Sequence, residues 1–130
     1  MNAQTIRVLY IGDDQSKLLN AINSAIPQDQ VMIATNSKTA LAMYALYMPD
    51  VIVIDSYSDA ARGAMPHLGV FGTSESIDLV LVMSDDVLRE LPPHAVMYQV
   101  PTTSNRHEIL YMLDRLMAER DVLINLPHSA

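Results

Sequence analysis

The sequence contains no cysteine, which excludes disulfide bonds, thiolate metal sites and cysteine nucleophiles. Basic residues are few: 8 Lys and Arg stand against 15 Asp and Glu, which gives a formal net charge of -7. Because no basic cluster is present, we expect no direct contact with nucleic acid. No apolar run approaches the roughly 20 residues that span a bilayer, and no leader-like segment opens the chain, so we expect a cytoplasmic protein without membrane contact.

Common catalytic motifs are missing as well. The chain has neither a glycine-rich phosphate loop nor a Gly-x-Ser-x-Gly nucleophile elbow, and its four histidines show no metal-ligand spacing. A hydrolytic or nucleotide-using enzyme is therefore unsupported by any motif, and we do not expect an enzyme.

What the chain does contain is enough apolar material for one folded domain. Its 130 residues are 50% hydrophobic, a normal globular share. We expect residues 1–121 to form the domain and residues 122–130 to form a C-terminal tail.

Short apolar runs alternate with amphipathic stretches along the whole chain. Five runs have the composition of β-strands: 6–11, 31–34, 51–54, 77–83 and 95–100. Helical spacing of apolar residues predicts helices over 15–26, 37–48 and 104–120. Glycines and prolines over 56–76 and at Pro92-Pro93 predict that the third and fourth helices are short or irregular. This alternation is typical of a doubly wound α/β fold with a five-stranded parallel sheet, for which we expect the strand order 2-1-3-4-5.

Acidic residues follow two of the predicted strands, at the edge of the sheet where such folds bind ligands. Asp13 and Asp14 come after the first strand, and Asp55 comes after the third. In the expected order these strands are neighbours, so the three carboxylates converge. Mg²⁺ is their natural partner, because it prefers oxygen ligands and offsets their charge. A carboxylate beside Mg²⁺ can attack a phosphoryl group to form an aspartyl phosphate.

Three segments carry a resemblance to a known family. Residues 7–14 (RVLYIGDD), 39–42 (TALA) and 49–55 (PDVIVID) resemble the receiver domain of two-component response regulators, and the similarity extends over roughly residues 6–119. The resemblance implies a flavodoxin-like domain in which Asp55 accepts phosphate from a sensor histidine kinase or a phosphotransfer protein.

The same resemblance implies roles for the residues around Asp55. Asp13 and Asp14 would bind Mg²⁺ together with Asp55, helped by the backbone carbonyl of Tyr57. Ser84, after the fourth strand, would be the switch hydroxyl that follows the phosphoryl group. A cis peptide bond would precede Pro101.

Several positions depart from the family pattern. Val100 stands where the family has a lysine, and valine cannot neutralise a phosphoryl group. Asp85 and Asp86 follow Ser84, where we expect two more carboxylates to repel an incoming phosphoryl anion. Met97 takes the place of the aromatic switch residue, with Tyr98 beside it.

Structural roles explain some of these residues equally well. Asp13 and Asp14 could be a helix cap and a first-turn acid, and Asp55 could cap a loop. Ser84 could cap a helix whose first turn holds Asp85 and Asp86.

The sequence thus leaves three functions open. The first is a stand-alone receiver-like signal transduction protein, phosphorylated on Asp55, that acts in trans on a protein output partner. The second is a pseudo-receiver that keeps the fold as a phosphorylation-independent protein interaction module. The third, an enzyme on the same scaffold, has no motif in its favour. Whether two copies form a homodimer stays open.

Overall fold

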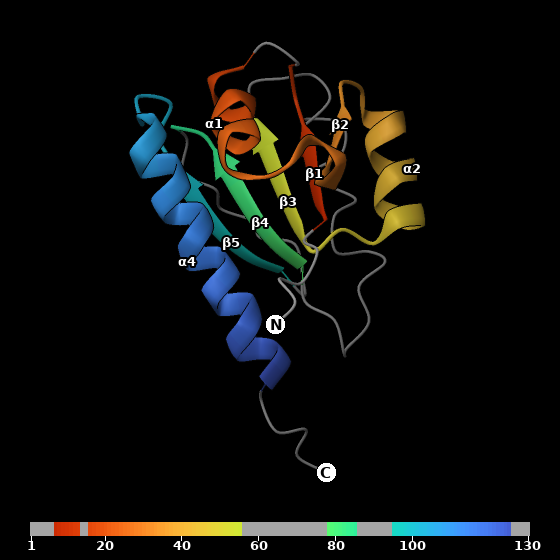
Figure 1. The fold of residues 1–130 in the computed structure, drawn as a ribbon. Coiled ribbons are helices and arrows are strands. Elements are labelled where there is room, and N and C mark those ends of the chain that lie inside the picture. Colours follow the sequence, from red (N-terminus) through yellow and green to blue (C-terminus); the bar gives the residue numbers. More distant parts are fainter. Residues whose placement is uncertain (1–6, 14–15, 56–77, 86–94, 126–130) are drawn as a thin grey trace.

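Five parallel strands form a single sheet at the centre of the protein (Figure 1). The structure is a computed structural model that describes residues 7–13, 16–55, 78–85 and 95–125. The strands are ordered 2-1-3-4-5 across the sheet. Their bounds are β1 Val8–Ile11, β2 Val31–Ala34, β3 Val51–Asp55, β4 Asp78–Met83 and β5 Ala95–Val100. The predicted doubly wound flavodoxin-like sheet and its strand order are therefore confirmed.

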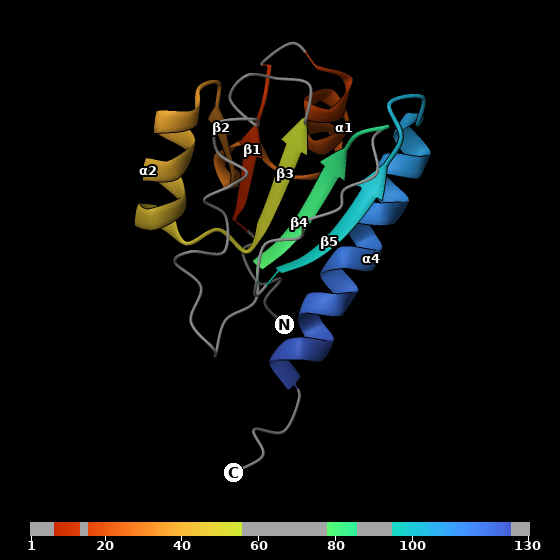
Figure 2. The same cartoon turned by 180° about the vertical axis from the view of Figure 1, so that it is seen from behind.

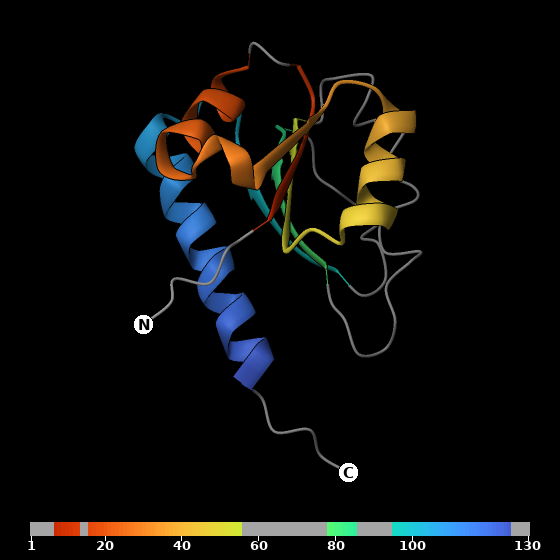
Figure 3. The same cartoon turned by 45° about the vertical axis from the view of Figure 1, so that its right-hand side comes forward.

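Helices cover the sheet on both faces, as Figures 2 and 3 show. α1 (Lys17–Ala25) and α4 (Arg106–Asn125) pack on one face, and α2 (Ser37–Tyr47) packs on the other. Neighbouring residues of each central strand point to opposite faces: Val53 contributes to the α1 and α4 side, and Ile54 to the α2 side. This explains why the central strands are apolar without interruption, since both of their faces are buried.

Side-chain caps begin two of the helices. Ser16 caps α1, where its Oγ accepts a hydrogen bond from the Leu19 backbone N–H at 3.0 Å. The cap of α1 is therefore Ser16, and the alternative that Asp13 caps this helix is wrong. At α4, Asn105 and Glu108 form a capping box: the Glu108 N–H donates to Asn105 Oδ1 at 2.9 Å, and the Asn105 N–H donates to Glu108 Oε1 at 3.2 Å.

The last helix is longer than its sequence pattern predicted. α4 continues to Asn125, whereas we expected it to end at residue 120. Residues 122–125 are thus helical, and the expected boundary between domain and tail falls inside this helix. The predicted third and fourth helices lie outside the described residues.

Removing the cap of α2 gives a first test of this fold. Asn36 precedes α2, and its Oδ1 accepts a hydrogen bond from the Thr39 N–H at 2.8 Å. Asn36→Ala leaves that N–H without its partner, so we expect it to lower the free energy of unfolding by about 1 kcal/mol in urea denaturation. The exposed Lys38→Ala on the same helix is the control. An equal effect of the two substitutions would contradict this assignment of the cap.

Candidate functional site

The candidate site lies at the carboxyl edge of the sheet, where β1, β3 and β4 end side by side (Figure 1). Ile11, the last residue of β1, pairs with Ile54, and the last residues of β3 and β4, Asp55 and Met83, pair with each other. The parallel register therefore brings the Asp13 loop, Asp55 and Ser84 to one edge. This confirms the strand arrangement on which the prediction of a shared site rested.

Gly12 shows how closely the ends of β1 and β3 approach. A Cβ atom on Gly12 would lie 2.8 Å from the Cβ of Asp55 and 2.6 Å from the Tyr10 hydroxyl oxygen, both too close for ordinary contact. The Gly12 N–H donates to the Ala34 carbonyl at 3.0 Å, which ties the same residue to the end of β2. The residue before Asp13 therefore sits directly against the base of the Asp55 side chain.

The Tyr10 hydroxyl organises the loop that carries Asp13. Tyr10 is 0% exposed, and its hydroxyl donates to the Asp13 carbonyl at 2.7 Å. The same oxygen lies 2.5 Å from Ser16 Oγ, the cap of α1. One buried hydroxyl thus joins the loop to the start of the helix that follows it.

Two of the four predicted cation ligands are described. Asp55 is half-buried at the end of β3, and Asp13 is exposed one residue past Gly12. Asp14 and Tyr57 lie outside the described residues, and within the described part of the chain no three His, Cys, Asp or Glu side chains form a metal-binding group. Two carboxylates on neighbouring strand ends fit a hard divalent ion that keeps part of its water shell, because such an ion needs few protein ligands. The Mg²⁺ site stays a prediction.

Ser84 is placed next to this edge. It follows Met83, the pairing partner of Asp55, and is 2% exposed. Its backbone N–H donates to the Val100 carbonyl at 2.9 Å, and its own carbonyl accepts from Gln99 Nε2 at 2.7 Å. The backbone of Ser84 is thereby fixed to β5. The helix that Ser84 was alternatively expected to cap falls outside the described residues.

Val100 belongs to the apolar core. It pairs with Met83 and is 2% exposed within the cluster between the sheet and the helices α1 and α4. Burial of an apolar side chain explains a valine here without any role at the phosphoryl site. The peptide bond before Pro101 is trans, so the cis bond that the family resemblance implied is absent.

Asp85 binds the loop that follows β5. Its Oδ1 accepts a hydrogen bond from the Thr102 backbone N–H at 2.9 Å, and its Oδ2 accepts one from Thr102 Oγ1 at 2.5 Å. Both carboxylate oxygens thus bind the loop after β5. These donors are neutral, so they leave the charge of Asp85 in place, and the expected repulsion of a phosphoryl anion stays a prediction. Asp86 lies outside the described residues.

A lysine also reaches this loop. Lys17 Nζ, from the first turn of α1, donates to the Thr102 carbonyl at 2.6 Å. Thr102 therefore connects α1 to the end of β4, since it binds Lys17 through its carbonyl and Asp85 through its N–H and hydroxyl. Although Val100 replaces the family lysine, the ammonium group of Lys17 binds the backbone two residues after Val100.

The two candidates for a switch residue on β5 face opposite sides of the sheet. Met97 packs with the α2-side cluster, and Tyr98 packs with the cluster beneath α1 and α4. The Tyr98 hydroxyl donates to Glu119 Oε2 on α4 at 3.1 Å. Tyr98 is therefore bound to the last helix. It cannot act as an aromatic switch residue in place of Met97, because it lies on the opposite face of the sheet.

Sequence reasoning missed Tyr10, Lys17 and Thr102. Tyr10 falls inside a strand-like run, where alternation predicts a core residue and gives no sign of a hydrogen-bonding role. Lys17 and Thr102 are 85 residues apart in the chain. The one local signal is Gly12 beside the acid pair, since a glycine at the end of a strand often marks a close approach of another chain segment.

Solved structures share this fold at low sequence identity. A response regulator receiver modulated diguanylate cyclase from Pelobacter carbinolicus has a TM-score of 0.66 and 20% identity, over 93% of this chain and 99% of that one. The N-terminal domain of an uncharacterized protein from Wolinella succinogenes has a TM-score of 0.65 and 15% identity, over 91% of this chain and 98% of that one. No family model and no curated protein matches the chain. The described helices include none that is long and apolar enough to cross a membrane. The comparisons therefore show the receiver fold.

Proposed function

We propose that this domain is a receiver module of signal transduction in which Asp55 accepts a phosphoryl group with the help of Mg²⁺. The observation that carries the proposal is the close approach of Gly12 to the base of the Asp55 side chain. This approach places the acid loop, which begins at Asp13 after β1, beside the end of β3. Asp13 is the next residue, and Ser84 follows the neighbouring strand. This supports one site that holds a nucleophile, a cation ligand and a hydroxyl.

Each residue would have a defined task. A carboxylate oxygen of Asp55 attacks the phosphorus atom, a new O–P bond forms, and the bond from phosphorus to the donor's leaving group breaks. Asp13 and Asp55, with Asp14 and the Tyr57 carbonyl, would hold Mg²⁺, which supplies charge compensation for the transferring oxygens when bound. The Ser84 hydroxyl would donate a hydrogen bond to the phosphoryl group. Its backbone contacts would pass that interaction to β5.

The phosphoryl donor in this proposal is a sensor histidine kinase or a phosphotransfer protein, and the output is a protein partner. The net charge of -7 supports a protein rather than a nucleic acid as the output, because binding to a phosphate backbone requires basic clusters.

Chemical phosphorylation tests the proposal. We expect acetyl phosphate with Mg²⁺ to add one phosphoryl group by intact mass, and beryllofluoride with Mg²⁺ to shift the backbone amide signals of Asp55 and Ser84. Asp55→Asn should abolish both responses, because the amide is no nucleophile. Asp29→Asn, which removes an exposed carboxylate of the 3₁₀ turn Gln28–Gln30, should leave both unchanged. An adduct that persists in Asp55→Asn, or that never forms on the unaltered protein, contradicts the proposal.

A second candidate is an interaction module that needs no phosphorylation. Val100 favours it, since a buried valine supplies no charge at the phosphoryl site. A cavity of about 350 Å³ also lies between the end of β5 and the first turns of α4, with Pro101, Ser104 and Tyr111 in its wall. Ser104 is 1% exposed, and its Oγ has no hydrogen-bond partner among the described residues. In this second candidate, a side chain of the partner would occupy the hollow between β5 and α4.

Partner binding separates the two candidates. A partner that binds the unaltered protein and Asp55→Ala with equal affinity, with or without beryllofluoride, favours the interaction module. A partner whose affinity rises with beryllofluoride only when Asp55 is present favours the receiver.

A further inference from the structure

We infer that Tyr10 is a positioning residue for the acid loop: its buried hydroxyl fixes the backbone at Asp13 and thereby prepares this loop to bind a divalent cation. The inference rests on the proposed function, since it concerns the cation site of that function. It assigns a role in the site to a core residue of β1 that carries no charge.

The hydrogen bonds around Tyr10 have a defined direction. The Asp13 carbonyl can only accept, so the single phenolic hydrogen of Tyr10 points to it. Ser16 Oγ must then donate its own hydrogen to the Tyr10 oxygen, at 2.5 Å. Ser16 Oγ in turn accepts from the Leu19 N–H. The result is a chain of three hydrogen bonds from the first turn of α1 to the Asp13 carbonyl, in which each bond strengthens the next.

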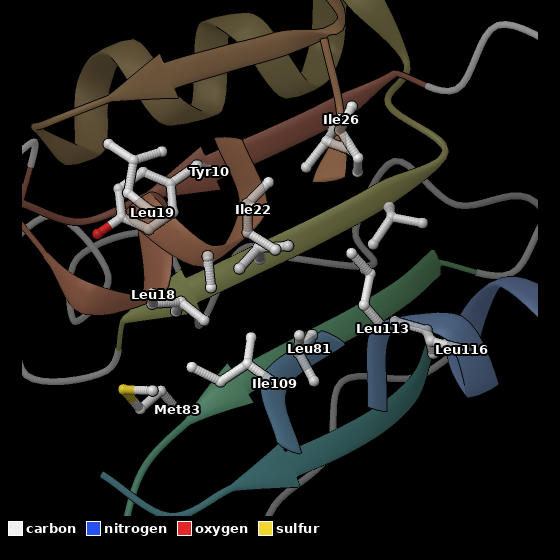
Figure 4. Packing of buried hydrophobic residues seen from close by; sticks show 14 of the residues in the cluster. Tyr10, Leu18, Leu19, Ile22, Ile26, Leu81, Met83, Ile109, Leu113 and Leu116 are labelled. Atoms are coloured by element: carbon white, nitrogen blue, oxygen red, sulfur yellow. The ribbon is translucent and has the colours of Figure 1, made fainter. Parts of the chain in front are cut away.

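The Tyr10 side chain is held rigidly in this position. It is 0% exposed and belongs to the core cluster with Leu18 and Ile22 of α1, as Figure 4 shows. Tyr10 pairs with Val53 on β3, two residues before Asp55. The hydroxyl oxygen and the Asp55 Cβ both lie within 2.8 Å of the point where a Gly12 Cβ would stand. One rigid ring therefore connects the β1 loop, the α1 cap and the base of the phosphoacceptor side chain.

Fixing the carbonyl matters because, among the described residues, few other hydrogen bonds hold the Asp13 backbone. The Asp13 side chain is exposed, and within the described part of the chain its carbonyl receives one further hydrogen bond, from the Ser16 N–H at a long 3.4 Å. Without the Tyr10 bond the loop samples more conformations, and binding a cation must then restrict them at a cost in entropy. Tyr10 lowers this entropy cost because it restricts the loop before the cation binds.

A Mg²⁺ titration followed by NMR of the Gly12, Asp13 and Asp55 backbone amides tests this role. We expect Tyr10→Phe to raise the dissociation constant for Mg²⁺ about threefold to tenfold, the loss that one neutral hydrogen bond represents. Tyr98→Phe is the matched control: it removes another tyrosine hydroxyl bond, to Glu119, far along the sheet from Asp13. The dissociation constant for Tyr98→Phe should equal that of the unaltered protein.

A double variant distinguishes positioning from a general loss of stability. Ser16→Ala breaks the same hydrogen-bond chain, so Tyr10→Phe combined with Ser16→Ala should weaken Mg²⁺ binding no more than the stronger single substitution does. The inference is overturned if the double variant raises the dissociation constant for Mg²⁺ by the product of the two single effects. It is also overturned if Tyr10→Phe binds Mg²⁺ as tightly as the unaltered protein. If the unaltered protein shows no Mg²⁺-dependent shift, the cation site of the proposed function fails, which is a separate result.

Discussion

Gly12→Ala is expected to lower the free energy of unfolding by about 2–4 kcal/mol, from forced overpacking and an unfavourable backbone conformation together. The new methyl group would meet the Tyr10 hydroxyl at 2.6 Å and the Asp55 Cβ at 2.8 Å, so at least one strand end has to shift. The φ angle of Gly12 is 157°, which side-chain-bearing residues rarely adopt. Urea denaturation followed by circular dichroism measures the loss.

The Gly12 substitution should also impair the proposed site, because the shift displaces Asp55 or the loop before Asp13. Tyr10→Phe removes the nearest of the clashing atoms, so we expect the double variant Gly12→Ala, Tyr10→Phe to be more stable than the two single losses predict. Strict additivity, or a Gly12→Ala protein within about 0.5 kcal/mol of the unaltered one, would show that the two strand ends are not in contact.

Leu81→Ala should destabilise the domain by about 2–5 kcal/mol, because it leaves a cavity in the middle of the core. Leu81 is 0% exposed in β4, which has β3 and β5 on either side. It belongs to the cluster that includes Ile109 and Leu113 of α4, visible in Figure 4. A domain of this size has about 5–15 kcal/mol of stability in total, so the loss is a large fraction of it.

Leu46→Ala is the matched control, since it deletes the same atoms from a residue that is 75% exposed on α2. We expect a change within about 0.5 kcal/mol. Similar losses for Leu81→Ala and Leu46→Ala in urea denaturation would contradict the interior position of β4, between β3 and β5.

Hydrophobic patterning predicted the positions of all five strands well. The ranges for β2 and β5 agree with the structure at both ends, and β3 is one residue longer than predicted. The end of the last helix was less predictable. α4 continues through residues 121–125 because nothing in that segment, neither glycine nor proline, stops a helix before Pro127.

The candidate site was predictable only in part. Acidic residues directly after two strands indicate a common edge, because parallel strands of a doubly wound sheet end together. The roles of Asp85 and Val100 were harder to predict from the sequence. Whether Asp85 faces a ligand or Thr102, and whether Val100 is core or site, depends on loops that are far apart in the chain.

By itself the sequence determined the α/β class, the five strands and the strand ends at which the acidic residues stand. These follow from local rules, since side-chain periodicity and turn residues act over a few neighbours. Only the tertiary structure decided that Gly12 touches Asp55, that a buried tyrosine hydroxyl holds the Asp13 carbonyl, and that Lys17 reaches Thr102. Such contacts depend on distances between separately folded segments, which periodicity along the chain does not encode.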